Sequence, residues 1–164
     1  MKLHELKALL QFWQDLQIEH WTLLVLSFFT LVRLAEILDI VWRHVFLEEK
    51  YVYLPWSKND PEGEGTYVTL LPEALDALVR LKESLRFPPE PSAKIFSIPQ
   101  SSLNPWFAAQ CAKAHIGPYT WYHLKHGGAT HFTLLSWSFS HIKRHGRWKS
   151  DQAARVYIHA PVSL

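Results

Sequence analysis

The stretch WYHLKHGGATHF, residues 121–132, holds three histidines within nine positions beside a lysine and a Gly-Gly pair. On a helix, His123 and His126 would share a face, whereas His131 would lie about 80° from His123 around the axis. The sequence has no HExxH motif and no CxxC pair, and this region has no carboxylate before Asp151. A metal site is therefore the least favoured interpretation, which leaves an ordinary helix or one half of an active site.

The glycine pair in this stretch bears on that choice. Two glycines inside a helix cost about 1–2 kcal/mol relative to alanine. A helix that keeps Gly127 and Gly128 should therefore gain from the missing side chains. The usual gain is the close approach of another backbone or of a DNA phosphate. The pair argues against a purely passive helix.

The composition indicates one soluble domain. The chain has 164 residues, of which 48% are hydrophobic and 20% charged. Its longest apolar run, Trp21 to Val32, is too short to cross a bilayer, and no signal peptide is recognisable. Cys111 is the single cysteine, so no disulfide framework is expected. We expect an intracellular protein that does not enter a membrane.

The charge is distributed unevenly along the chain. The net charge is only +2, yet the segment from Lys113 to the end holds seven Lys or Arg residues against one acid, Asp151. The first 112 residues consequently carry ten basic and fourteen acidic groups. One positive side suits a polyanion such as nucleic acid, although a solvated basic face without a partner would have the same composition.

Periodicity and turn residues predict an α+β domain, mostly helical, with a small three-stranded antiparallel sheet. Pro-rich FPPEPSAK, residues 87–94, is interpreted as a connector inside a single domain that spans residues 1–164. Helices are expected at 3–16, 19–29, 33–40, 72–85, 101–115, 122–135, 138–145 and 150–159, and strands at 45–47, 51–54 and 66–70.

Four motifs occur in an order that resembles one known family. YHLKHGGAT followed by GRWKSDQAARVYIH resembles the C-terminal half of a tyrosine recombinase, a member of the phage-integrase superfamily. Upstream, VRLAEILDIVWRHV resembles the first arginine box of that family, and SKNDPEGEG resembles its lysine-bearing β-hairpin. The resemblance covers nearly the whole chain and is greatest to recombinases of DIRS-type retroelements and related eukaryotic mobile elements.

The resemblance assigns roles to individual residues. Arg33 matches the first catalytic arginine and Glu36 its structural neighbour, while Lys58 matches the hairpin lysine. Trp148 falls at the position held by His or Trp, nine residues before Tyr157, which matches the nucleophile.

The middle box departs from the family pattern. When the sequence is aligned on Gly-Gly-Ala-Thr, the usual histidine is Tyr122 and the second catalytic arginine is Lys125. Moving the alignment by one residue, to read His123-x-x-His126, restores the histidine but loses the arginine and the Gly-Gly-Ala-Thr register. We therefore keep Tyr122 and Lys125 as the site residues.

The family implies cleavage and rejoining of double-stranded DNA through a 3′-phosphotyrosyl intermediate, without metal or cofactor. Because Lys125 lacks the guanidinium fork, impaired catalysis or an inactive DNA-binding module are the alternatives. DNA contacts are expected from four basic residues near the C-terminus: Lys143, Arg144, Arg147 and Lys149.

The assembly and compartment are also expectations from the resemblance. The family's N-terminal core-binding domain has no counterpart in this sequence. The resemblance therefore implies a monomer for this domain alone and a tetramer on DNA in a full-length context. A eukaryotic origin would imply the nucleus, and any other origin the cytoplasm.

Overall fold

The computed structural model describes residues 1–13, 17–55 and 65–158. The predicted fold class is confirmed: these residues are mostly helical, with a three-stranded antiparallel sheet in the order β1-β2-β3. The helices are α1 (Leu3–Leu10), α2 (Ile18–Thr30), α3 (Leu34–Leu38), α4 (Pro72–Glu83), α5 (Leu103–Lys113), α6 (Tyr122–Leu134), α7 (Phe139–His145) and α8 (Asp151–Arg155). The strands are β1 (Val45–Phe46), β2 (Tyr51–Leu54) and β3 (Thr66–Thr69), and short 3₁₀ turns lie at Trp42–His44 and Gln100–Ser102.

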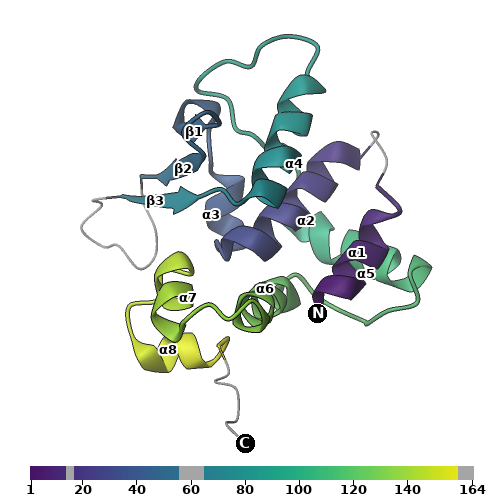
Figure 1. Ribbon diagram of the computed structural model, residues 1–164. Coiled ribbons are helices and arrows are strands. Elements are labelled where there is room, and N and C mark those ends of the chain that lie inside the picture. Colours follow the sequence, from purple (N-terminus) through teal and green to yellow (C-terminus); the bar gives the residue numbers. More distant parts are fainter. Residues whose placement is uncertain (14–16, 56–64, 159–164) are drawn as a thin grey trace, which may run out of the picture.

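Helix α2 forms the centre of the core. Every residue from Trp21 to Thr30 is buried, as its apolar sequence predicts. The two polar side chains near its end are satisfied internally, because the hydroxyls of Ser27 and Thr30 donate to the carbonyls of Leu23 (2.8 Å) and Leu26 (2.6 Å). Helix α4 packs on one side of α2 and α6 on the other, with α7 and α8 beyond α6 (Figure 1).

The glycine pair of α6 allows this helix to approach α2 closely. A Cβ atom on Gly128 would collide with the carbonyl oxygen of Phe28 in α2, and one on Gly127 would collide with the carbonyl oxygen of Met1. The sequence left two reasons for these glycines open, the close approach of another backbone or of a DNA phosphate. The structure shows the first, because backbone atoms lie against both glycines.

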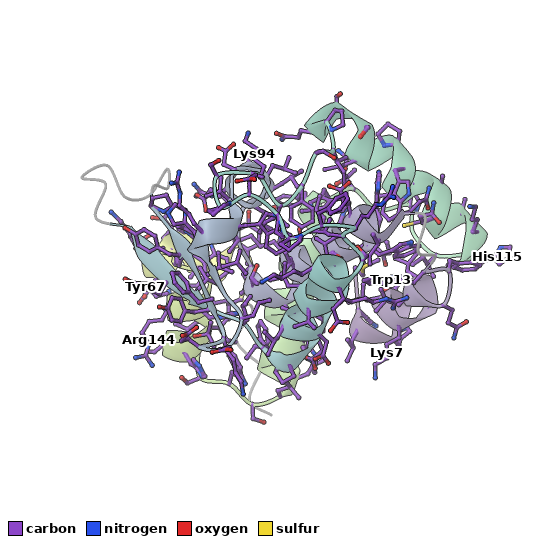
Figure 2. All side chains as sticks on the ribbon, turned by 90° about the horizontal axis from the view of Figure 1, so that it is seen from above. Lys7, Trp13, Tyr67, Lys94, His115 and Arg144 are labelled. Carbon is purple, nitrogen blue, oxygen red and sulfur yellow. The ribbon has the colours of Figure 1, made fainter. Side chains whose placement is uncertain are left out.

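The sheet has one buried and one aromatic face. In the antiparallel register Val52 pairs with Val68, and both are buried. On the other face Tyr53 pairs with Tyr67, and their ring centroids are 5.1 Å apart. Tyr67 is 67% exposed and lies at one end of the molecule, far from His115 at the other (Figure 2).

The last helix is shorter than predicted. The sequence pattern indicated a helix over 150–159, but α8 ends at Arg155. The backbone N–H groups of Tyr157 and Ile158 both donate to the carbonyl of Ala154, at 2.9 and 2.8 Å, and Ile158 turns into the core. Tyr157 consequently lies on the turn after α8. The first helix also ends earlier than predicted, at Leu10.

None of the helices in the three described ranges has the length and apolar character that crossing a bilayer would require.

Candidate active site

A cleft of about 620 Å³ brings together residues from distant parts of the chain. Arg33 and Tyr157, which are 124 positions apart in the sequence, both line it. Five of the predicted site residues therefore share one cavity: Arg33, Tyr122, Lys125, Trp148 and Tyr157. The remaining lining residues are Ser27, Val32, Leu34, Gln100, Asn104, Trp121, Ala153 and Val156.

Arg33 is placed by the sharp turn between α2 and α3. Helix α2 ends at Leu31, whose φ of +59° is in the left-handed region. Arg33 then has an extended backbone and begins α3, because its carbonyl accepts hydrogen bonds from the N–H groups of Glu36 and Ile37, both at 3.0 Å. The turn brings the arginine to the wall of the cleft.

The start of α6 is fixed by Trp121. Its backbone N–H donates to Asn104 Oδ1 of α5 at 2.8 Å, and its indole Nε1 donates to Ser27 Oγ of α2 at 2.9 Å. These bonds connect α6 to two neighbouring helices directly before Tyr122. Tyr122 and Lys125 then follow within one helical turn and both face the cleft.

The segment after α7 carries Trp148 into the cleft. Arg147 has a φ of +59°, which turns the chain out of α7, and the N–H of Trp148 donates to the carbonyl of Lys143 at 3.1 Å. The Trp148 ring stacks on the Tyr157 ring, with centroids 5.2 Å apart and planes 27° apart. Lys125 Nζ lies 4.7 Å from the Trp148 centroid and 5.3 Å from that of Tyr157.

Positive charge is concentrated around Lys125. Burial, together with the nearby charges of Arg33 and Arg147, lowers the pKa of Lys125 to about 8, while Glu36 acts in the opposite direction. An excess of cations in a half-enclosed cleft attracts an anion, which would neutralise part of their repulsion. The cleft is therefore suited electrostatically to a phosphate.

Glu36 and Arg147 form an ion pair next to this cluster. Arg147 Nη2 lies 2.6 Å from Glu36 Oε2, and their side chains are only 13% and 7% exposed. Arg147 Nε has no hydrogen-bond partner among the described residues. The pair joins the end of α7 to α3, and so connects the segment that carries Trp148 to the helix that begins at Arg33.

The other three predicted DNA contacts lie nearer the surface. Arg144 and Lys149 are exposed, and Lys143 Nζ pairs with Asp151 Oδ1 at 2.8 Å, which connects α7 to α8. Arg144 lies toward the same end of the molecule as Tyr67 (Figure 2). Arg147 differs from them because its side chain is directed to Glu36.

Tyr157 is protonated at neutral pH. Burial raises the pKa of its phenol, as do the charge of Tyr122 and a hydrogen bond to Tyr122, whereas Arg33 lowers it. The Tyr157 oxygen would therefore have to lose a proton before or during any nucleophilic attack.

The three histidines of the 121–132 stretch have different surroundings. His123 Nδ1 accepts from the N–H of Thr120 at 2.9 Å, and His131 lies against Phe28 and Phe29 of α2, with centroids 5.9 and 5.8 Å away. His126 contacts the Tyr157 ring, with centroids 4.5 Å apart. In the part of the chain that the structure describes, no three His, Cys, Asp or Glu side chains gather as metal ligands would.

Sequence reasoning did not assign three residues of this region. Gln100 and Asn104 line the cleft, and no motif pointed to them. His126 could have been found, because it lies one helical turn after Tyr122 and therefore on the same face of α6. Lys58, the predicted hairpin lysine, lies outside the described residues.

No family model and no curated protein matches the sequence. Solved structures do match it. The crystal structure of XerA recombinase superposes with a TM-score of 0.77 at 18% identity, over 98% of this chain and 58% of that chain. The Tn1549 transposon integrase in complex with circular intermediate DNA superposes with a TM-score of 0.76 at 12% identity, over 99% of this chain and 63% of that chain. The integrase from mycobacterium phage Brujita superposes with a TM-score of 0.71 at 13% identity, over 95% of this chain and 51% of that chain.

These likenesses concern the fold. The chain spans between 51% and 63% of the length of these three proteins, and the matches cover nearly all of it. At such low identities, the shared feature is the arrangement of helices and the small sheet. The chain has the fold of a tyrosine recombinase catalytic domain.

Proposed function

We propose that this chain is a tyrosine recombinase catalytic domain, which cleaves and rejoins DNA strands with Tyr157 as the nucleophile. The observation that carries the proposal is the shared cleft: Arg33, Lys125, Trp148 and Tyr157 come from separate segments and line one cavity. A phosphodiester in that cavity would meet two cations, an indole and a phenol together. The fold of the solved relatives supports the same assignment.

The proposed reaction begins with attack of the Tyr157 oxygen on a phosphorus atom of the DNA backbone. A bond forms between that oxygen and phosphorus, the bond to the 5′ oxygen breaks, and a 3′-phosphotyrosyl link results. Negative charge develops on the non-bridging oxygens, so the cations Arg33 and Lys125 stabilise the transition state more than the ground state. The Trp148 indole N–H adds a donor, and Lys58 would protonate the leaving 5′ oxygen.

Rejoining is the reverse reaction. The 5′ hydroxyl of another strand attacks the phosphotyrosyl link, and Tyr157 leaves with its proton restored. The energy of the phosphodiester is kept in the covalent link, so no cofactor is needed. Exchange of strands in this way is site-specific recombination or integration.

The proposed partner is double-stranded DNA, and the Tn1549 integrase was solved in complex with DNA. Exposed Arg144 and Lys149, with Lys143 beside them, would contact phosphates outside the cleft. From the motifs, we also propose that the chain belongs with recombinases of DIRS-type mobile elements, acts in the nucleus if its host is eukaryotic, and forms a tetramer on DNA in a full-length context.

A second candidate function is a DNA-binding module without catalysis. It is favoured by two positions of the middle box, where Tyr122 and Lys125 replace the histidine and arginine of the family pattern. Loss of one positioned donor to a transition-state oxyanion typically costs about 3–4 kcal/mol, or roughly 10²–10³ in rate. A binding module would keep the basic surface while losing the reaction.

Covalent trapping separates the two candidates. The protein is incubated with a suicide DNA substrate, nicked so that the released fragment diffuses away, and adduct is measured by denaturing electrophoresis. An active recombinase yields an SDS-stable adduct that maps to Tyr157 by peptide mass spectrometry. Tyr157→Phe should abolish the adduct and leave the DNA affinity nearly unchanged. DNA binding without adduct in the unaltered protein, with its flanking domain present, would establish the binding module instead.

A further inference from the structure

The end of α7 is attached to the end of α2 by a hydrogen bond. His145 is the last residue of α7, and its Nε2 atom lies 2.7 Å from the carbonyl oxygen of Phe29, in the last turn of α2. A carbonyl oxygen can only accept, so Nε2 carries the proton and donates it. The two residues are 116 positions apart in the sequence, and α7 lies below the end of α2 in Figure 1.

The Phe29 carbonyl is a group that needs a partner from outside its helix. The last four carbonyls of a helix lack an intrahelical donor, and α2 ends at Thr30, where Leu31 takes a left-handed backbone conformation. The imidazole of His145 satisfies one of these four carbonyls from another helix. Burial lowers the pKa of His145, while the Phe29 carbonyl acts in the opposite direction, so the imidazole is neutral at pH 7.

The ring of His145 is also held by aromatic contacts. It meets Phe132 of α6 edge to face, with centroids 5.2 Å apart, and meets Trp137 in the same manner at 5.6 Å. His145 therefore contacts α2, α6 and the segment that leads into α7. A side chain fixed by three neighbouring segments is suited to position the chain that follows it.

The chain that follows His145 carries Trp148 into the cleft. A Cβ atom on Gly146 would collide with the Trp148 ring, so this ring lies directly against the backbone of Gly146. A movement at the end of α7 would consequently move Trp148. On the other side of the hydrogen bond, the turn that follows Phe29 carries Arg33 to the same cleft. The bond thus joins the two segments that supply Trp148 and Arg33.

We propose that His145 is a positioning residue for the cleavage step, because it holds Trp148 at the distance from Arg33 that a scissile phosphate requires. The inference rests on the proposed function, in which Trp148 donates to that phosphate. A shift of about 1 Å in a group that contacts the substrate can lower a rate by about 10²-fold. The ion pair between Glu36 and Arg147 keeps the same two segments connected when His145 is replaced.

The test compares substitutions of His145 that differ in their hydrogen bond to Phe29. In His145→Gln the amide Nε2 takes the place of the imidazole Nε2, whereas His145→Asn is too short and His145→Leu has no donor. The matched control is His141→Leu, because His141 lies one turn earlier on α7 and also contacts Trp137, with centroids 3.9 Å apart.

The measurements are the single-turnover rate of adduct formation on a nicked suicide duplex at saturating DNA, the DNA dissociation constant, and the midpoint of urea unfolding. His145→Leu and His145→Asn should each form adduct about tenfold or more slowly than the native protein. Their DNA dissociation constants should stay native, since the exposed basic residues bind the DNA. His145→Gln and His141→Leu should react at close to the native rate.

A double variant separates the positioning of Trp148 from a general loss of structure. Trp148→Phe removes the indole N–H and keeps an aromatic ring. Because His145 acts through Trp148, adding His145→Leu to Trp148→Phe should slow the reaction little further. Rate losses that multiply in the double variant, or native rates for His145→Leu and His145→Asn, would overturn the inference while leaving the proposed function standing. Absence of adduct from the native protein would overturn both.

Discussion

Lys125 offers the sharpest prediction, because its charge can be removed by pH while that of arginine cannot. With a pKa of about 8, Lys125 is charged in roughly nine molecules of ten at pH 7 and in roughly one of ten at pH 9. The sign follows from the lowered pKa: the charged form is present below pH 8 and is lost as the pH rises through it. An arginine remains charged throughout this range.

The magnitude can be worked from these fractions. At pH 7, Lys125→Arg should form adduct about tenfold faster, if the planar fork recovers ~1.4 kcal/mol of transition-state stabilisation. At pH 9 the charged fraction of Lys125 in the native protein is about tenfold lower than at pH 7. The variant should then form adduct roughly 100-fold faster than the native protein. The ratio of the two rates cancels the titration of Tyr157, which both proteins share.

The assay is adduct formation on a nicked suicide duplex, with DNA held below saturation. Under these conditions the pH dependence reports the free protein, in which no bound phosphate raises the pKa of Lys125. Lys113→Arg is the matched control, because Lys113 is exposed at the end of α5 opposite to the cleft residue Asn104. A variant-to-native ratio that stays constant from pH 7 to pH 9, or a native protein as fast as the variant, would refute the reasoning.

Three further predictions concern DNA affinity and stability. Fluorescence anisotropy should show a loss of roughly 40-fold in DNA affinity between about 50 and 200 mM salt if three phosphates are neutralised, and a flat response would contradict electrostatic binding. Gly128→Ala should lower the free energy of unfolding by about 1–3 kcal/mol in urea titrations, since its Cβ meets the Phe28 carbonyl, and an unchanged midpoint would contradict this packing. Glu36→Ala should lower the free energy of unfolding by about 3–5 kcal/mol in the same titrations, because it leaves the Arg147 guanidinium buried without its carboxylate partner. Asp39→Ala removes an exposed ion pair and should lower it by less than about 1 kcal/mol.

Local patterns in the sequence were sufficient for the elements and the fold class. The apolar run around Trp21–Val32 is helical and central, and the alternation of Val52 and Leu54 with tyrosines places one face of the sheet in the core. These outcomes depend on short-range hydrophobic periodicity, which can be read directly from the sequence. The motifs likewise indicated Arg33, Lys125, Trp148 and Tyr157 as one group, although their catalytic roles stay predictions.

Interactions between distant residues were decided by the tertiary structure. No motif in the sequence linked Glu36 to Arg147, yet Glu36 Oε2 lies 2.6 Å from Arg147 Nη2, in a segment more than 100 positions later. Tyr157 leaves its helix because the burial of Ile158 turns the chain. His126 reaches Tyr157 only because α6 and the turn after α8 meet at the cleft. Each of these contacts depends on how whole elements pack, and packing is a property of surfaces that no local pattern of residues encodes.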